Sequence, residues 1–403
     1  MLNTTLAPWP SYSPDEMQAV TEVLQSGRVN YWTGDVTRRF EKAFADWTGT
    51  KHAVALANGT LALDLALKAL GVGAGDEVIV TPRTFIASVS TVVNARAIPV
   101  FADVDEQTQG LSAATILPRL TERTKAVICV HLGGTPCDMD PIMDLADARG
   151  LFVIEDCAQA HGATYNGRPV GSIGHIGAWS FCQDKIMTTG GEGGMVTTND
   201  TDLWRRMWSF KDHGKDWDAV YTRQHPPGFR WLHESFGTNW RMLEMQAAIG
   251  LIQLGKMAGW TEKRRHNAQL IAEALGRCEA VNVRAEDPRT LDARYRLYGF
   301  VDPDRLRPGW SRDRIIAEIN ARGIPCFQGS CSEVYLEKAF EGTGWRPSQR
   351  LPVARRLGET SLCFLVHPTL TDDDIAHTCN AIEAVLSQAC GAPSGGPVQA
   401  HRI

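Results

Sequence analysis

The sequence predicts an α/β fold with a mainly parallel sheet of seven strands flanked by helices, followed by a smaller α+β region. Short apolar or β-branched runs alternate with helical patterns up to about residue 200. The helices between these runs are the crossovers that parallel strands require. Helical patterns dominate after about residue 250. We therefore expect a large domain over residues 1–254 and a smaller C-terminal domain over residues 255–390.

The first predicted element is a helix that begins near Ser13, which is a good N-cap and is followed by proline and two acidic residues. Further helical patterns separate several of the strand candidates. The seven strand candidates are residues 52–57, 77–82, 98–104, 126–131, 151–156, 177–182 and 194–199.

The second half of the chain opens with two helical patterns, at residues 241–257 and 261–276. A strand candidate at residues 295–301 and a helical pattern at residues 311–323 follow them. The tail, residues 391–403, is rich in small and turn-forming residues without periodicity. It is predicted to be disordered.

Composition narrows the possible functions. The 403 residues are 43% hydrophobic, which suffices for a packed core, and the 41 basic and 46 acidic residues are well mixed. The sequence therefore predicts no basic surface of the kind that binds nucleic acid. The apolar runs have the length of strands, and the N-terminus lacks a charged segment followed by an apolar one. We expect no nucleic-acid partner, no membrane span and a cytoplasmic location.

The ten cysteines lie scattered without a CxxC pair, so we expect reduced thiols. Cys326 and Cys331 are the closest pair in sequence, but no histidine near them completes a zinc-binding spacing. We therefore expect no metal site.

Four glycines follow Lys185 closely in the segment "FCQDKIMTTGGEGGMV", residues 181–196. Such a cluster marks left-handed turns or a backbone that another group approaches closely, although a plain loop is the alternative. The segment lacks the order of a phosphate loop, and no GxGxxG follows a strand. Nucleotide-binding motifs therefore do not explain these glycines.

Ligands of open α/β sheets bind beyond the carboxyl ends of strands, where three further features lie. Residues 58–60, "NGT", end a strand and open a helix, so they form an anion site or merely cap the helix. Asp156 ends another strand, where a buried carboxylate requires a partner. Phe85 follows a third strand and offers either a flat face to a ligand or a core contact. Together with Lys185, these features describe a site for pyridoxal phosphate.

The sequence resembles the DegT/DnrJ-type sugar aminotransferases, a family of fold-type I pyridoxal phosphate enzymes. The resemblance covers nearly the whole chain. Its landmarks, in order, are "NYWTG", "ANGTLALDLAL", "TPRTFIAS", "HLGGTPCDMDPI", "EDCAQAHGA", "WSFCQDKIMTTGGEGGM", "GTNWRMLEMQAAIG" and "HPTLTDDDI". It implies pyridoxal phosphate as cofactor and pyridoxamine phosphate as its intermediate form.

The resemblance also implies roles around the cofactor ring. Lys185 would form the Schiff base and move protons, and Asp156 would hold the pyridine nitrogen. Gln159 would lie near the ring hydroxyl, and Phe85 would stack on the ring.

The phosphate would be bound by Gly59, Thr60 and Ser180. Asn239, in the "GTNWR" stretch, would reach the phosphate of a partner subunit, which implies a homodimer with shared active sites. A turn or cap hydrogen bond is the plainer role for Ser180, as it is for Gln159.

Substrate residues are expected where the chain departs from the family. Arg83 stands at a position that is often uncharged or aromatic, and it is either a binder of an acceptor phosphate or carboxylate or part of a structural ion pair. The segment 326–335, "CFQGSCSEVY", also departs, and Gln328 is its candidate. His213 is a further pocket candidate, whereas His161 is expected to be structural rather than catalytic.

The resemblance also implies the reaction, which is transfer of an amino group from L-glutamate to a nucleotide-linked keto sugar in amino-sugar or surface-polysaccharide biosynthesis. One alternative is a sugar dehydratase of the same family, but those relatives carry histidine at the lysine position. The other is a regulatory relative without turnover. The presence of Lys185, Asp156 and the phosphate turn together argues against the second alternative.

Overall fold

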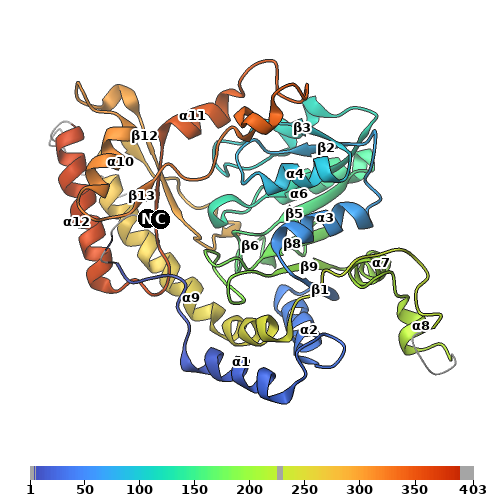
Figure 1. The fold of residues 1–403 in the computed structure, drawn as a ribbon. Helices are drawn as coiled ribbons and strands as arrows, with labels where there is room; N and C mark the ends of the chain where they lie inside the picture. Colours follow the sequence, from blue (N-terminus) through green and yellow to red (C-terminus); the bar gives the residue numbers. More distant parts are fainter. Residues whose placement is uncertain (1–3, 5, 225–229, 391–403) are drawn as a thin grey trace.

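A computed structural model describes residue 4, residues 6–224 and residues 230–390 of the chain. The tail predicted to be disordered, residues 391–403, lies outside the described residues. Figure 1 shows a large sheet in the N-terminal half and a smaller, separate sheet in the C-terminal half, with the long helix α9 beside both. No helix within the described ranges combines the length and the apolar character needed to cross a membrane.

The large sheet has the strand order β1-β9-β8-β5-β4-β2-β3. Strands β8, β5, β4, β2 and β3 pair in parallel, whereas β9 is antiparallel to both of its neighbours. All seven predicted strands are present, and the mainly parallel α/β fold is confirmed. Their bounds are β1 His52–Leu56, β2 Glu77–Val80, β3 Ile98–Phe101, β4 Thr124–Val130, β5 Phe152–Asp156, β8 Ile176–Ser180 and β9 Gly194–Thr198.

Helices cover both faces of this sheet. Successive strand residues point to opposite sides, and in the central strands the side chains of both faces are apolar and buried. Val80 and Ile128 belong to a core shared with helices on one face, whereas their neighbours Ile79 and Val127 pack with helix α6 on the other. The helices of the first face are α3 Gly59–Ala69, α4 Ala87–Asn94 and α7 Thr201–Lys211. The helices of the second face are α2 Val36–Thr48, the short α5 Ala113–Ile116 and α6 Met139–Arg149.

The predicted N-terminal helix is α1, Pro14–Ser26. Ser13 and Glu16 form a reciprocal capping box at its start, in which each side chain bonds to the other residue's backbone. The helix ends at Gly27 in a left-handed conformation.

The C-terminal half carries an antiparallel sheet with the order β10-β12-β14-β13. Its strands are β10 Val281–Asn282, β12 Leu297–Val301, β13 Cys326–Phe327 and β14 Ser361–Phe364. Its helices are α10 Arg312–Asn320, α11 Pro352–Thr360 and α12 Asp372–Ala389. A three-stranded sheet joins the two halves; its strands are β6 Thr164–Tyr165, β7 Arg168–Pro169 and β11 Thr290–Leu291. The remaining short α-helix, α8 Trp217–Tyr221, follows α7 in the N-terminal half.

The two helical patterns predicted after residue 240 form one helix of 33 residues, α9, Glu244–Gly276. Its first part packs with α1 and α2, and its last part packs with α12 and β12. The proposed domain boundary at residue 254 falls inside this helix, so the position of the boundary stays a prediction.

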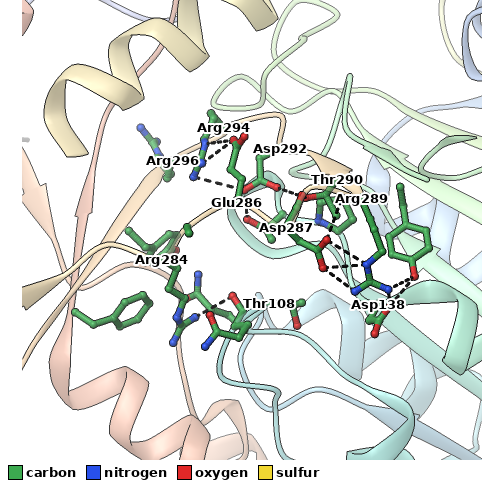
Figure 2. A pocket seen from close by; sticks show the side chains of 18 residues that line it. Thr108, Asp138, Arg284, Glu286, Asp287, Arg289, Thr290, Asp292, Arg294 and Arg296 are labelled. Atoms are coloured by element: carbon green, nitrogen blue, oxygen red, sulfur yellow. Dashed lines mark hydrogen bonds and ion pairs between the residues drawn. The ribbon is translucent and has the colours of Figure 1, made fainter. Parts of the chain in front are cut away.

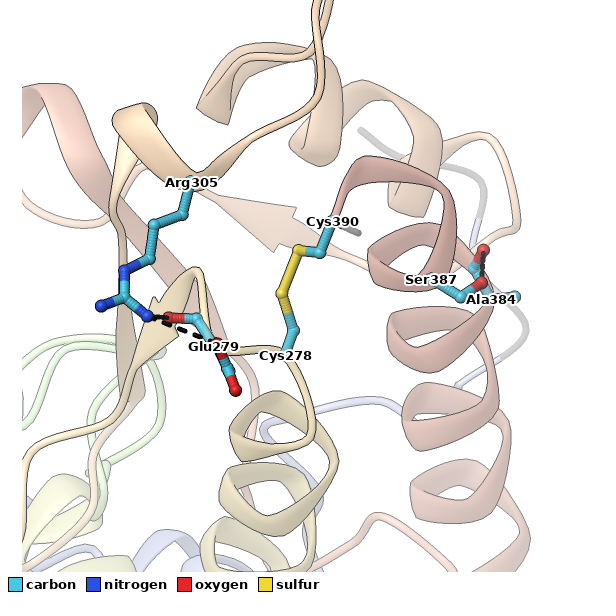
Figure 3. Close-up of a disulfide and its surroundings, with 6 residues drawn as sticks. All are labelled: Cys278, Glu279, Arg305, Ala384, Ser387 and Cys390. Carbon is cyan, nitrogen blue, oxygen red and sulfur yellow. Dashed lines mark hydrogen bonds and ion pairs between the residues drawn. A yellow bond between two sulfur atoms is a disulfide. The ribbon is translucent and has the colours of Figure 1, made fainter. Parts of the chain in front are cut away.

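The expectation that all cysteines are reduced is wrong for one pair. Cys278 and Cys390 form a disulfide with an S–S distance of 2.06 Å across 112 positions of sequence (Figure 3). Cys278 lies just beyond the end of α9, and Cys390 directly follows α12. The packing of these two helices brings the thiols together, and no short-range spacing in the sequence signals it.

Candidate active site

A cavity of about 1090 Å³ lies at the carboxyl ends of the large sheet's parallel strands. Its other wall comes from the C-terminal half, chiefly from Tyr295, Arg296, Tyr298, Phe327, Gly329, Ser330, Cys331, Val334 and Glu337. The predicted cofactor residues of this chain line it together: Gly59, Thr60, Phe85, Asp156, Gln159, Ser180 and Lys185. The cavity therefore lies where the topology of an open α/β sheet places ligands.

Lys185 lies in the turn that follows β8, and only 16% of its side chain is exposed. Its Nζ lies 3.6 Å from Oδ2 of Asp184 and 5.4 Å from the centroid of the Tyr295 ring. Its backbone carbonyl accepts a hydrogen bond of 2.8 Å from Nε1 of Trp9. Sheet, N-terminal segment and C-terminal half together fix the position of this amine.

Asp184 remains ionised beside this amine. Burial acts to raise the pKa of its carboxyl, but the charge of Lys185 and a hydrogen bond donated by the Tyr295 hydroxyl outweigh it, so the pKa is lowered. The lysine thus has a carboxylate partner in the cavity wall.

Asp156 is the last residue of β5, and its side chain is buried. Its Oδ2 accepts a hydrogen bond of 2.8 Å from the Ser88 hydroxyl, and its Oδ1 accepts one of 3.1 Å from the Ala158 backbone N–H. Burial raises the pKa of this carboxyl. A buried carboxylate in a cavity is stabilised by a ligand cation, and a protonated pyridine nitrogen supplies one.

The start of helix α3 forms an anion site. The Asn58 side chain caps the helix by accepting a hydrogen bond of 3.0 Å from the Leu61 N–H, and the helix begins at Gly59. A Cβ built on Gly59 would lie 2.5 Å from Cβ of Ser180, so no larger residue fits between this helix end and β8. Free N–H groups and the positive helix end face the cavity beside the Ser180 side chain.

The glycines after Lys185 have a structural reason. Gly191 has a φ of 125°, which side-chain-bearing residues rarely adopt. A Cβ on Gly194 would lie 2.2 Å from the backbone oxygen of Asn58. The cluster therefore reverses the chain and lets β9 pass directly under the anion site.

Phe85 is 69% exposed, so its ring is available to the cavity rather than buried in a core. Gln159 also lines the cavity, and its Oε1 accepts a hydrogen bond of 2.7 Å from the Gly133 N–H. An amine, a buried carboxylate, a helix N-terminus and an exposed aromatic face are thus gathered in one cavity. This set of groups fits pyridoxal phosphate.

Comparison with known proteins identifies the family. The model of the DegT/DnrJ/EryC1/StrS aminotransferase family matches residues 10–383. The chain belongs to this family. Membership confirms the fold-type I architecture, the class of sugar aminotransferases and the pyridoxal phosphate cofactor that the resemblance implied.

Individual relatives of this aminotransferase align over most of their length. The GDP-perosamine synthase of Caulobacter vibrioides is 39% identical over 364 residues, which cover 88% of this chain and 92% of that protein. The spore coat polysaccharide biosynthesis protein SpsC of Bacillus subtilis is 36% identical, over 94% of this chain and 96% of that protein. The X-ray structure of an aminotransferase from Psychrobacter cryohalolentis is 63% identical with a TM-score of 0.93, over 94% of this chain and 98% of that one.

Arg83 does not line the cavity of the aminotransferase, which favours the structural one of its two expected roles over binding of the acceptor. It is fully buried, and its guanidinium donates hydrogen bonds to the Gln109 side chain and to the hydroxyls of Ser332 and Ser361. Ser332 and Ser361 belong to the C-terminal half. Arg83 therefore links the two halves behind the cavity wall.

Two other substrate candidates also lie outside the cavity lining. Gln328 is exposed and donates to Asp313, although its neighbours Phe327 and Gly329 do line the cavity. His213 is exposed as well, with a φ of 61°. Gln328 differs from the lining residues on either side of it in the direction of its side chain, and the sequence pattern alone does not predict that direction.

Asn239 is exposed and lies outside the cavity of its own chain. His161, by contrast, is fully buried against Trp179 and Phe181 at ring distances of 5.2 and 5.6 Å. Burial lowers its pKa to about 3, so it is neutral at physiological pH. A neutral, enclosed imidazole outside the cavity lining agrees with the structural role expected for His161.

Four residues of the site escaped the sequence interpretation. Ser88 lies three positions after Phe85, and helical spacing turns its hydroxyl to Asp156. Asp184 directly precedes Lys185. Tyr295 and Arg296 stand at the start of a segment that reads only as a strand, and their place in the cavity depends on packing between the two halves.

Proposed function

We propose that this aminotransferase transfers the amino group of L-glutamate to a nucleotide-linked keto sugar, in the biosynthesis of an amino sugar for a surface polysaccharide. The observation that carries the transaminase chemistry is the convergence of Lys185, Asp156 and the start of α3 in one cavity. The names of relatives support the substrate class, since one is a GDP-perosamine synthase and another acts in spore coat polysaccharide biosynthesis.

Pyridoxal phosphate, when bound, supplies an electron sink for the bonds around the amino-bearing carbon. Asp156 would keep the pyridine nitrogen protonated, because a carboxylate already held by Ser88 and Ala158 faces that position. The backbone N–H groups of Gly59 and Thr60 would bind the phosphate at the helix end. Phe85 would restrict the ring to one plane.

Lys185 would move the proton. Its Nζ is the only amine that lines the cavity within the described residues, and Asp184 lies close enough to orient its protonated form. Tyr295 would steady this pair, since its hydroxyl bonds to Asp184 and its ring lies against the lysine. The dehydratase alternative finds no support at this position, because its members carry histidine there.

Two half-reactions followed by absorbance test this proposal. L-glutamate should convert the yellow holoenzyme to its pyridoxamine form, and a nucleotide-linked keto sugar from a panel should restore the yellow form. Lys185→Ala should do neither. A holoenzyme that binds pyridoxal phosphate but gives no spectral change with glutamate and any keto sugar of the panel would favour the regulatory alternative.

We also propose a homodimer with shared active sites. Asn239 lies outside its own cavity, and the residues that shortly precede it in sequence expose large apolar side chains, Trp231 at 75% and Phe236 at 99%. A partner surface would cover these side chains. Asn239 would then reach the partner's phosphate site.

Mixing inactive variants tests the shared site. Lys185→Ala and Asn239→Ala chains, each inactive alone, should regain activity when refolded together, because one site of the heterodimer receives both intact residues. The exposed Arg119→Ala mixed with Lys185→Ala controls for refolding. No gain of activity above that of the separate variants, or a fully active monomer, would contradict the proposal. The cytoplasmic location remains a prediction.

A further inference from the structure

Basic groups are few in the cavity. Among the described residues that line it, Lys185 and Arg296 are the only lysine and arginine, whereas Asp156, Asp184, Glu192 and Glu337 are acidic. Lys185 is committed to the cofactor. Arg296 is therefore the one guanidinium among the described lining residues that is available to an anionic substrate in the cavity.

The partners of neighbouring arginines make Arg296 distinct. Figure 2 shows Arg294, two positions earlier, joined to Glu286 and Asp292 by dashed lines. Arg289 is similarly paired with Asp287. Arg296 forms no ion pair with a carboxylate in the described part of the chain. Its guanidinium has the Tyr295 hydroxyl as a hydrogen-bond partner, and it lines both this small arginine-rich pocket and the main cavity.

The position of Arg296 relates it to the reacting amine. Its Cζ lies 4.9 Å from the centroid of the Tyr295 ring, and Nζ of Lys185 lies 5.4 Å from the same centroid. Tyr295 therefore has both cations near one ring. A small molecule whose nitrogen reacts at the lysine position can place a carboxylate a few bonds away at the guanidinium, which binds carboxylates through paired donors.

We propose that Arg296 binds a carboxylate of the amino-group donor. The proposal rests on the proposed aminotransferase function and adds the residue that selects the donor's charge. The same chemistry, a pair of anionic oxygens, is also present in the diphosphate of a nucleotide-linked sugar. The donor is favoured because Arg296 and Lys185 lie against the same tyrosine, whereas a diphosphate is separated from the reacting carbon by the sugar ring.

Binding and single-turnover measurements on the holoenzyme test the proposal. Glutarate is a dicarboxylate probe without an amine, and UDP and GDP are diphosphate probes, all titrated by calorimetry. Arg296→Gln should weaken glutarate about 10- to 100-fold, the range for a lost charged hydrogen-bonding pair. It should slow the glutamate half-reaction to a similar extent and leave UDP and GDP binding unchanged. Arg296→Lys, which keeps the charge, should be intermediate.

Arg294→Gln is the matched control, because it removes a nearby guanidinium that is already paired, and Glu286 retains Arg265 at 2.8 Å. This control should bind glutarate as the wild type does. Weakened UDP or GDP binding with unchanged glutarate binding would assign Arg296 to the acceptor and overturn the proposal. Equal loss of all probes, or no loss of any, would also overturn it. Failure of the proposed aminotransferase function gives a different result: the wild-type holoenzyme would show no spectral change with any L-amino acid. In that case the binding of glutarate would still decide the role of Arg296.

Discussion

The amine of Lys185 lies 3.6 Å from the carboxylate of Asp184, the residue that precedes it in sequence. Consecutive side chains seldom meet in regular structure, but the turn after β8 brings these two into the same cavity. Tyr295, from the C-terminal half, donates a hydrogen bond to the same carboxylate. The charge of Lys185 is thus balanced by its neighbour Asp184. Asp184 is in turn held by Tyr295, which lies 110 positions after the lysine in sequence.

This pair predicts a pH-dependent contribution to stability. Because the pKa of Asp184 is lowered from its usual 3.8, its stabilising effect is full above that value and is lost as the pH falls through the lower, folded-state pKa. Asp184→Asn should therefore lower the free energy of unfolding by at most about 1 kcal/mol at neutral pH, since the side chain is partly exposed. Urea unfolding across acidic pH should show this difference shrinking toward zero. A difference that grows in acid would contradict the pairing, and the exposed Glu122→Gln is the control.

The buried carboxylate of Asp156 is expected to lower the stability of the apoenzyme and to strengthen the binding of pyridoxal phosphate. Burial raises its pKa, so its contribution to the stability of the apoenzyme falls as the pH rises through that pKa. At neutral pH, apo Asp156→Asn should be no less stable than the wild-type apoenzyme. Its affinity for pyridoxal phosphate should fall at least about tenfold, because the charge partner of the pyridinium is lost. Thermal unfolding and fluorescence titration measure the two effects; a destabilised apoenzyme with unchanged cofactor affinity would refute this role.

Arg83 predicts a structural rather than a substrate-specific defect. Arg83→Ala should lower the free energy of unfolding by about 3 kcal/mol or more, because buried polar partners in both halves lose their donor. Arg83→Lys should recover little, since an ammonium does not reproduce the spread of the guanidinium donors. Chemical unfolding measures this, with exposed Arg119→Ala as control. A fully stable Arg83→Ala whose only defect is a raised KM for the keto sugar would restore the sugar-binding role.

The disulfide predicts a redox-dependent stability. Cys278→Ser should lower the free energy of unfolding by about 2 to 5 kcal/mol in non-reducing buffer, because the bond closes a loop between positions 112 apart. A reductant should bring the wild type down to the level of the variant. Cys379→Ser, which removes a free thiol, is the control. Equal stability of wild type and Cys278→Ser without reductant would show that the bond does not form.

The sequence predicted those parts of the molecule that depend on local pattern. Apolar runs of strand length mark all seven strands of the large sheet, and the strand ends carry Lys185, Asp156 and Gly59, which the structure brings into one cavity. Short strands such as β6, with two residues, carry no periodicity to detect. The two predicted helical patterns form the single helix α9 because no proline separates them, and Gly259, which lies between them, is accommodated inside the helix.

Features that depend on packing between distant parts of the chain could not be predicted from the sequence pattern. Arg83 follows a strand just as Phe85 does, but its side chain turns into the contact between the halves. Tyr295 and Arg296 belong to a different half from Lys185, and only the fold brings them together. Cys278 and Cys390 meet for the same reason.

Borohydride reduction of the holoenzyme, followed by peptide mapping, tests the central claim most directly. Reduction fixes the cofactor to the lysine that holds it, so its mass should appear on the peptide that contains Lys185, and Lys185→Ala should carry no label and show no turnover. Lys211 and Lys215 are the internal controls, since neither lines the cavity. A label on Lys211 or Lys215 in place of Lys185 would contradict the account.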